Sequence, residues 1–145
     1  MADNLKPEDR RKTMRAVKGK GTQPERQLFS MLAGMGLGGW RKNADDLIGK
    51  PDVVFPCEQV AIFVDGCFWH GCPHCQRKLP QTNRAYWQRK IKRNVELASL
   101  TNQQLRAAGW RVIRIWEHEI RNLADRKRIS DEIRRALNNK ELERQ

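Results

Sequence analysis

The sequence predicts a single α/β domain in which a mixed β-sheet is flanked by helices. Three observations support this class: a length of 145 residues, which is typical of one domain, an ordinary apolar share of 39%, and an alternation of helix-like and strand-like segments. Apolar runs are too short to cross a membrane, and the first residues lack the apolar core of a secretory signal. We therefore expect a cytoplasmic protein with no membrane partner.

The first part of the chain is divided into an arm and a helix. Residues 1–21 are polar and basic and carry no apolar stripe, which predicts a flexible N-terminal arm ahead of one folded domain at 22–145. Residues 22–35 are predicted to be helical because their apolar residues recur at three- and four-residue steps. Thr22 followed by Glu25 is typical of a capping box at the start of a helix.

The rest of the chain predicts a sheet with two further helices. Three short strand-like segments follow the first helix, at residues 40–43, 52–55 and 60–65. The last two are close enough in sequence to form a β-hairpin. A long helix is expected over 82–108, with Thr82 as its cap and Gly109 as its terminator. Residues 110–116 then predict a strand, and 124–143 a charged amphipathic helix.

The charge of the chain indicates its class of partner. A formal net charge of +12, together with five tryptophans, is typical of a folded domain that binds a polyanion, and we expect nucleic acid. If the charged residues served only to keep the protein in solution, an excess of positive over negative charge would not be needed. The basic residues of the long helix, together with the N-terminal arm, are predicted to neutralise phosphates; they include Lys90, Lys92 and Arg93.

Three of the four cysteines are clustered and interleaved with two histidines, in the run Cys67-Phe68-Trp69-His70-Gly71-Cys72-Pro73-His74-Cys75. Without a secretion signal, such a cluster favours zinc, which takes four thiolate or imidazole ligands. The remaining histidine, His118, is a candidate for a distant ligand. The CxxC spacing of Cys72 and Cys75 also fits a thiol-redox pair, but the surrounding Gly and Pro make this interpretation the weaker one.

Acidic residues mark one end of the predicted hairpin. Asp52 begins one strand and Asp65 ends the next, so pairing of the strands would bring both carboxylates to one pole of the sheet, where they could hold Mg²⁺. Such an ion can polarise a scissile phosphate. Glu25 could join through a water, and His70 could act as a general acid or base there or could instead be a zinc ligand. Taken singly, each carboxylate could equally be a turn or cap residue.

Two aromatic residues, Phe68 and Trp69, lie between the candidate zinc ligands. Apolar side chains held rigidly in such a loop can wedge into a base stack. Alternatively, they fold onto a small core.

Four segments together resemble the very short patch repair DNA mismatch endonucleases over roughly residues 8–120. They are Gly49-Lys50-Pro51-Asp52-Val53-Val54-Phe55, Phe63-Val64-Asp65-Gly66-Cys67-Phe68-Trp69-His70-Gly71-Cys72-Pro73, Lys90-Ile91-Lys92-Arg93-Asn94-Val95, and Gly109-Trp110-Arg111-Val112 with Trp116-Glu117. The resemblance implies a restriction-endonuclease-like core of the PD-(D/E)xK type, a structural zinc, and Mg²⁺-dependent nicking of double-stranded DNA beside a T:G mismatch. It also implies a monomer of the bacterial nucleoid with mismatch-repair proteins as possible partners.

The resemblance also implies roles for individual residues. Asp52 resembles the metal-binding aspartate, His70 the catalytic histidine, and Glu25 an acidic residue that reaches the metal through water. The intercalating aromatic residues correspond to Phe68, Trp69 and Trp87, and the helix that carries Trp87 also provides the DNA-contacting run from Lys90 to Asn94. Cys67, Cys72 and His118 resemble three zinc ligands; Cys75 is expected as the fourth because thiolate is the softer donor, with His74 as the alternative.

One departure from the family concerns the catalytic centre. The best-studied form of the family has a second active-site histidine where this chain has Asp65. An aspartate can bind metal directly but cannot donate a proton at pH 7. Two alternatives to the mismatch endonuclease remain: a non-catalytic zinc module that binds DNA, and a related nuclease with another DNA substrate.

Overall fold

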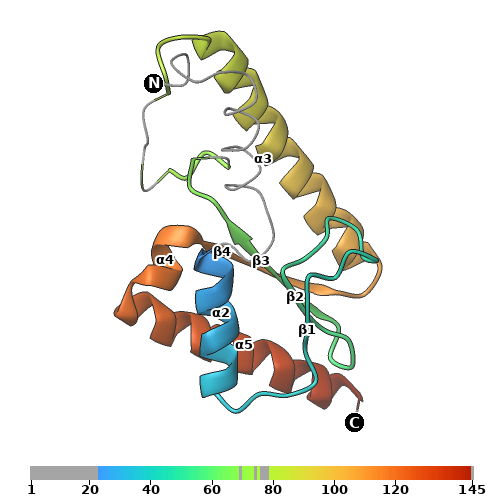
Figure 1. The fold of residues 1–145 in the computed structure, drawn as a ribbon. Helices are drawn as coiled ribbons and strands as arrows, with labels where there is room; N and C mark the ends of the chain where they lie inside the picture. Colours follow the sequence, from blue (N-terminus) through green and yellow to red (C-terminus); the bar gives the residue numbers. More distant parts are fainter. Residues whose placement is uncertain (1–22, 69, 74, 76–78, 145) are drawn as a thin grey trace.

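The computed structural model describes residues 23–68, 70–73, 75 and 79–144, with residues 139–144 described by their backbone alone, and it has a mixed α/β fold (Figure 1). One sheet contains four strands in spatial order: β1 (Arg41–Lys42), β2 (Val53–Phe55), β3 (Val60–Asp65) and β4 (Arg111–Trp116). The first three strands are antiparallel, and β4 runs parallel to β3. The sheet is therefore mixed, as the sequence predicted.

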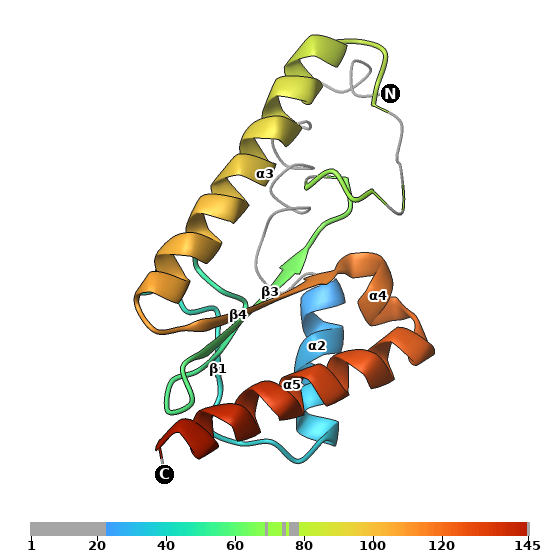
Figure 2. The same cartoon turned by 180° about the vertical axis from the view of Figure 1, so that it is seen from behind.

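Helices cover both faces of this sheet. They are α2 (Gln23–Gly34), α3 (Arg84–Ala107), α4 (Glu117–Arg121) and α5 (Leu123–Arg144). In Figures 1 and 2, α2, α4 and α5 lie on one side of the sheet and α3 lies on the other, because the chain crosses over through α3 between β3 and β4. In the part of the chain that the structure describes, no helix combines the length and apolar character that crossing a membrane requires.

The two faces of the sheet bury separate apolar clusters. The larger joins the sheet to α2, α4 and α5, and its fully buried members include Leu28, Leu32, Phe55, Ile62, Ile120, Ile129 and Ile133. The smaller lies under the C-terminal half of α3 and consists of Ala44, Val54, Ala61, Phe63 and Leu105, with Leu47, Trp110 and Val112 packed against it. Alternate strand residues point to opposite faces, which divides the apolar residues of β2 and β3 between the two clusters.

The predicted hairpin is confirmed, with Val53 paired to Ile62 and Phe55 paired to Val60. Its register brings Asp52, immediately before β2, close to the end of β3, where the backbone N–H of Val64 donates to the Asp52 carboxylate at 2.7 Å. The two strand ends that carry the predicted acidic residues therefore meet at one edge of the sheet.

The structure differs from the sequence prediction at two helix starts. Helix α3 begins at Arg84 with Asn83 as its N-cap in the left-handed conformation (φ 59°), so the prediction of Thr82 as the cap was wrong. The short helix α4, which follows β4 directly, was not predicted. The predicted capping box at Thr22 and the predicted arm at 1–21 lie outside the described residues.

Candidate active site and metal centre

Three carboxylates converge at the edge of the sheet where β2 begins and β3 ends. Asp52 accepts a hydrogen bond from Val64, and Asp65, the last residue of β3, is buried with 6% of its surface exposed. Glu25 reaches the same place from the first turn of α2 and acts on Asp52 through both its charge and a side-chain hydrogen bond. The structure thus brings together the three acidic residues that the sequence singled out.

The convergence has a strong electrostatic effect on Asp52. Burial raises the pKa of its carboxyl from 3.8 to about 7, and the negative charges of Glu25 and Asp65 act in the same direction, against the Val64 hydrogen bond, which lowers it. Carboxylates forced together in this way favour a bound cation. Oxygen donors of this kind are the ligands that Mg²⁺ prefers, so the donor set fits a hard divalent cation.

His70 lies beside this acidic cluster, with its Nε2 atom 3.8 Å from Oδ1 of Asp65. Its backbone N–H donates to the carbonyl of Gly66 at 3.1 Å, so the residue sits on a tight turn directly after β3. Its side chain is 28% exposed and therefore within reach of a ligand. Among the described residues, the metal cluster contains His118 and not His70, which leaves His70 beside the carboxylates.

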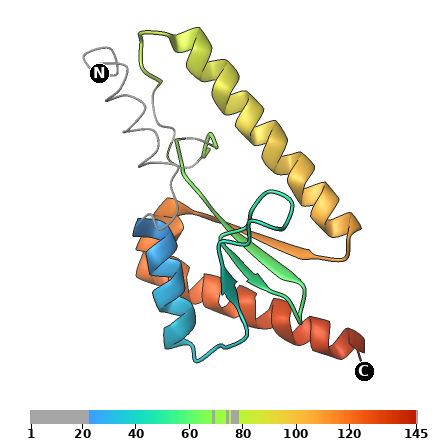
Figure 3. The ribbon, with the colours of Figure 1, turned by 45° about the vertical axis from the view of Figure 1, so that its right-hand side comes forward.

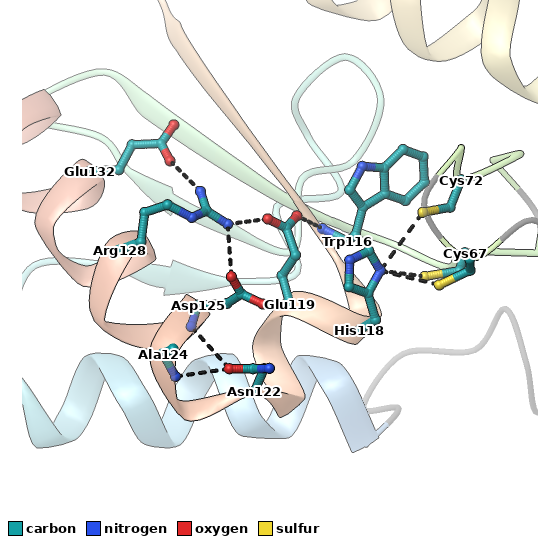
Figure 4. A network of polar contacts seen from close by, with 11 residues as sticks. Cys67, Cys72, Trp116, His118, Glu119, Asn122, Ala124, Asp125, Arg128 and Glu132 are labelled. Carbon is teal, nitrogen blue, oxygen red and sulfur yellow. Dashed lines mark hydrogen bonds and ion pairs between the residues drawn. The ribbon is translucent and has the colours of Figure 1, made fainter.

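A second cluster, of three thiols and one imidazole, begins with Cys67, two residues after Asp65 in the chain. The ligand atoms of Cys67, Cys72, Cys75 and His118 all lie within 4.8 Å of one another. Nδ1 of His118 is 3.3 Å from the sulfur of Cys67, 3.7 Å from that of Cys72 and 3.3 Å from that of Cys75. Figure 4 shows the imidazole of His118 directed toward the cysteines.

These distances fit a zinc ion. A tetrahedral zinc with ordinary bond lengths separates a sulfur from a nitrogen ligand by about 3.6 Å, close to all three measured values. Burial, with Cys72 and Cys75 nearby, raises the pKa of the Cys67 thiol to about 12. A bound cation would reverse this effect because it stabilises the thiolate. The structure therefore gathers the four residues expected as zinc ligands, with Cys75 in the set; His74 lies outside the described residues.

Backbone contacts fix the loop that carries these ligands. The N–H of Cys67 donates to the side chain of Glu117 at 3.0 Å, and the N–H of Cys72 donates to the carbonyl of Cys67 at 2.9 Å. Gly71 has φ +62°, and a Cβ there would come within 3.1 Å of Ile91 on α3, so the loop passes close to that helix. We call residues 66–75 the zinc loop.

Helix α4 presents His118, and a network of charges holds α4 in place (Figure 4). Glu119 accepts a hydrogen bond from the backbone N–H of Trp116 at 2.9 Å and pairs with Arg128 of α5. The same Arg128 lies 3.8 Å from Asp125 and from Glu132. The start of α4, and with it the imidazole, is thereby tied to the body of the protein.

The predicted DNA-contacting residues lie on α3 and the zinc loop. Trp87 is nearly buried (9% exposed), and its ring meets Phe68 edge to face with centroids 5.6 Å apart. Five basic residues occupy the first half of α3: Arg84, Arg89, Lys90, Lys92 and Arg93. An open pocket of about 390 Å³ lies between this helix and the zinc loop, and its lining includes Phe68, Gln88 and Lys92. Trp69 lies outside the described residues.

Two residues in contact with the acidic and thiol clusters were not identified from the sequence. Glu117 joins the zinc loop to α4, and Arg114 of β4 forms an ion pair with Asp65 at 2.8 Å. The sequence pattern could have identified Arg114, because it is a charged residue within the otherwise apolar run 112–115.

Comparison with known proteins identifies relatives along nearly the whole chain. Residues 2–77 match the model of the family described as DNA mismatch endonuclease Vsr. The type II nicking enzyme V.NaeI of Lentzea aerocolonigenes is 47% identical over 76% of this chain and 68% of its own. The type II nicking enzyme V.NmeDIP of Neisseria meningitidis serogroup C is 38% identical over 96% and 93%. The DNA mismatch endonuclease Vsr of Escherichia coli K12 is 38% identical over 91% and 82%.

Proposed function

The chain belongs to the DNA mismatch endonuclease Vsr family, and on this premise we propose that it is a Mg²⁺-dependent endonuclease that nicks one strand of double-stranded DNA beside a T:G mismatch. The observation that carries the proposal is the convergence of Glu25, Asp52 and Asp65 with His70 at one edge of the sheet. A DNA-binding module without catalysis has no need of three carboxylates and a histidine gathered at the same strand ends.

The catalytic roles follow from the position of each group. Asp52 and Asp65 would hold the ion, and Glu25 would hold a water beside it. When bound, Mg²⁺ polarises the scissile phosphate and lowers the pKa of water. His70 assists the attacking water, since an imidazole titrates near neutral pH and lies beside the acidic cluster. The helix–hairpin–crossover order, with acidic residues at the hairpin end, supports a restriction-endonuclease-like core of the PD-(D/E)xK type.

DNA is proposed to lie along α3 and the zinc loop. The basic first half of α3 neutralises phosphates, and Asn94 directly follows Arg93 on the same helix. Zinc on Cys67, Cys72, Cys75 and His118 stiffens the loop, so that its aromatic residues can separate base pairs. Trp87, which packs against Phe68, would support them from the helix. We further propose that the protein acts as a monomer and meets other mismatch-repair proteins on the DNA.

The test uses end-labelled duplexes that differ only in one base pair, T:G or matched, incubated with and without Mg²⁺ and resolved on denaturing gels. We expect a single Mg²⁺-dependent nick on the T:G duplex. The variant Asp52→Ala should abolish the nick while binding the duplex with unchanged affinity, measured by fluorescence anisotropy.

Three results would contradict this assignment in different ways. No metal-dependent nick on any duplex would favour a non-catalytic zinc module. Equal nicking of matched duplex or of other structures would indicate a nuclease with a different substrate. Loss of both nicking and binding in Asp52→Ala would show that Asp52 is structural.

A further inference from the structure

Arg114 connects the acidic cluster to α3 through its whole guanidinium group. Its Nη1 atom lies 2.8 Å from Oδ1 of Asp65, and its Nε atom donates to Oδ1 of Asn102 at 2.7 Å. Its Nη2 atom donates to the carbonyl of Ala98 at 3.4 Å, and the group stacks over the ring of Phe63 at 4.1 Å. A planar guanidinium held at this many points has one orientation.

The parallel pairing of β3 and β4 explains how Arg114 reaches Asp65. Arg114 is paired with Phe63 in the register, and Asp65 follows Phe63 by two residues, so all three side chains lie on the face of the sheet that α3 covers. Both partners are largely withdrawn from solvent, with 19% of the Arg114 side chain and 9% of the Asp65 side chain exposed. Removal of one partner from such a pair leaves the other charge buried and uncompensated.

The contact with Arg114 determines which carboxylate oxygen of Asp65 is available to bind a cation. Oδ1 faces both Arg114 and, at 3.8 Å, Nε2 of His70. With Oδ1 occupied in this way, Oδ2 is the oxygen that Asp65 can offer to a cation. Single-oxygen ligation suits Mg²⁺, which takes only one or two carboxylates and demands strict octahedral geometry.

We propose that Arg114 is a positioning residue of the nicking site. It anchors the Asp65 carboxylate to α3 and thereby fixes the position of this carboxylate relative to His70. The role rests on the proposed endonuclease function, since it concerns the same site. Arg114 touches neither DNA nor ion; it acts through Asp65.

The first experiment separates chemistry from binding. Single-turnover nicking of the T:G duplex and duplex affinity are measured for Arg114→Met, Arg114→Lys and Arg111→Met. Arg111→Met is the matched control, because it removes the same charge from the same strand. We expect Arg114→Met to nick roughly 100-fold more slowly, the scale of loss that follows a displaced catalytic group, with affinity within about 3-fold of wild type. Arg114→Lys should recover part of the rate, and Arg111→Met should nick at the wild-type rate.

The second experiment is a double-mutant cycle that does not depend on activity. Urea unfolding is followed for wild type, Arg114→Met, Asp65→Asn and the double variant. Arg114→Met removes the contacts with Asn102, Ala98 and Phe63 in both backgrounds, so we expect it to lower the unfolding midpoint in both, and by a larger amount in the Asp65 background, where it also leaves a carboxylate without compensation. Equal shifts of the unfolding midpoint in both backgrounds would show that Arg114 does not compensate the charge of Asp65.

The outcomes distinguish the two proposals. A wild-type protein that nicks no duplex refutes the proposed function, and the unfolding cycle still decides whether Arg114 compensates Asp65. A wild-type protein that nicks, with Arg114→Met equally fast, refutes only the positioning role. Parallel loss of nicking rate and duplex affinity in Arg114→Met also overturns it, since that pattern indicates a contact with DNA.

Discussion

Substitution of Asp52 by asparagine should stabilise the metal-free fold while it removes nicking. An asparagine side chain keeps an oxygen that can accept the hydrogen bond from the Val64 N–H but carries no charge. The pKa of Asp52 rises from 3.8 when unfolded to about 7 when folded, so the folded state favours the protonated form. Ionisation between these values therefore destabilises the wild-type fold as pH increases, and the Asp52→Asn variant escapes this cost.

The pKa difference sets the size of the effect. A shift from 3.8 to about 7 corresponds to at most about 4 kcal/mol, at about 1.36 kcal/mol per unit. At pH 4 the carboxyl is protonated in the folded state and partly protonated in the unfolded state, so the variant should be only slightly more stable than wild type. Above pH 7 the full difference should be present. Added Mg²⁺ should reduce the difference, because an ion that binds the folded wild-type cluster stabilises it.

The assay is urea unfolding at pH 4, 6 and 8 in zinc-replete, Mg²⁺-free buffer. Asp46→Asn is the control, since Asp46 is exposed and pairs with Arg41 on the surface. Because Arg41 holds the pKa of Asp46 below its usual value, this variant should be slightly less stable than wild type at pH 6 and 8, which is opposite in sign to the effect expected for Asp52→Asn. If Asp52→Asn is no more stable than wild type at pH 8, burial and the neighbouring carboxylates do not raise the pKa of Asp52, and the reasoning from this site is wrong.

Three further predictions concern the rest of the structure. Cys75→Ser should lower zinc content and the unfolding temperature, measured by metal analysis and circular dichroism, whereas Cys57→Ser, outside the cluster, should change neither. Leu105→Ala should cost about 2–5 kcal/mol in urea unfolding, since Leu105 is fully buried, whereas Leu100→Ala at a half-exposed site should stay within about 0.5 kcal/mol. Duplex affinity should fall roughly 500-fold between 50 and 200 mM salt if all five basic residues of α3 reach phosphates, and a flat response would count against α3 as the DNA face.

Local patterns were enough to predict most of the sheet. The bounds of β3 agree with the prediction, and the hairpin with β2 placed Asp52 and Asp65 at one edge, because two continuous apolar runs separated by a short turn define both strands. The cysteine spacing likewise predicted a metal cluster. These features depend on neighbours within about 20 residues of one another in the chain.

The sequence did not predict features that depend on contacts between residues far apart in the chain. Arg114 meets Asp65 across 49 residues of chain, and only the parallel register of β4 reveals the contact. Helix α4 was missed because it is short and follows β4 without a break. Its start is stabilised by Glu119, which in turn needs Arg128 of another helix. At α3, left-handed Asn83 rather than Thr82 precedes the first helical residue, a choice of backbone conformation that residue type alone did not distinguish.

Helix α3 is anchored to the sheet through its C-terminal half. Its C-terminal half is anchored to the sheet by Leu105 and by the contacts of Asn102 and Ala98 with Arg114, whereas Figure 3 shows its other end extending far from the sheet. From the anchor at Ala98 to the first residue, Arg84, the helix is about 21 Å long, so a tilt of about 10° at the anchor would displace the far tip by about 4 Å, about one base-pair step. The packing of Trp87 on Phe68 therefore supports the first half of α3. In the proposed mode of DNA binding, a metal bound by the zinc-loop ligands would determine how accurately the duplex is aligned with the acidic cluster.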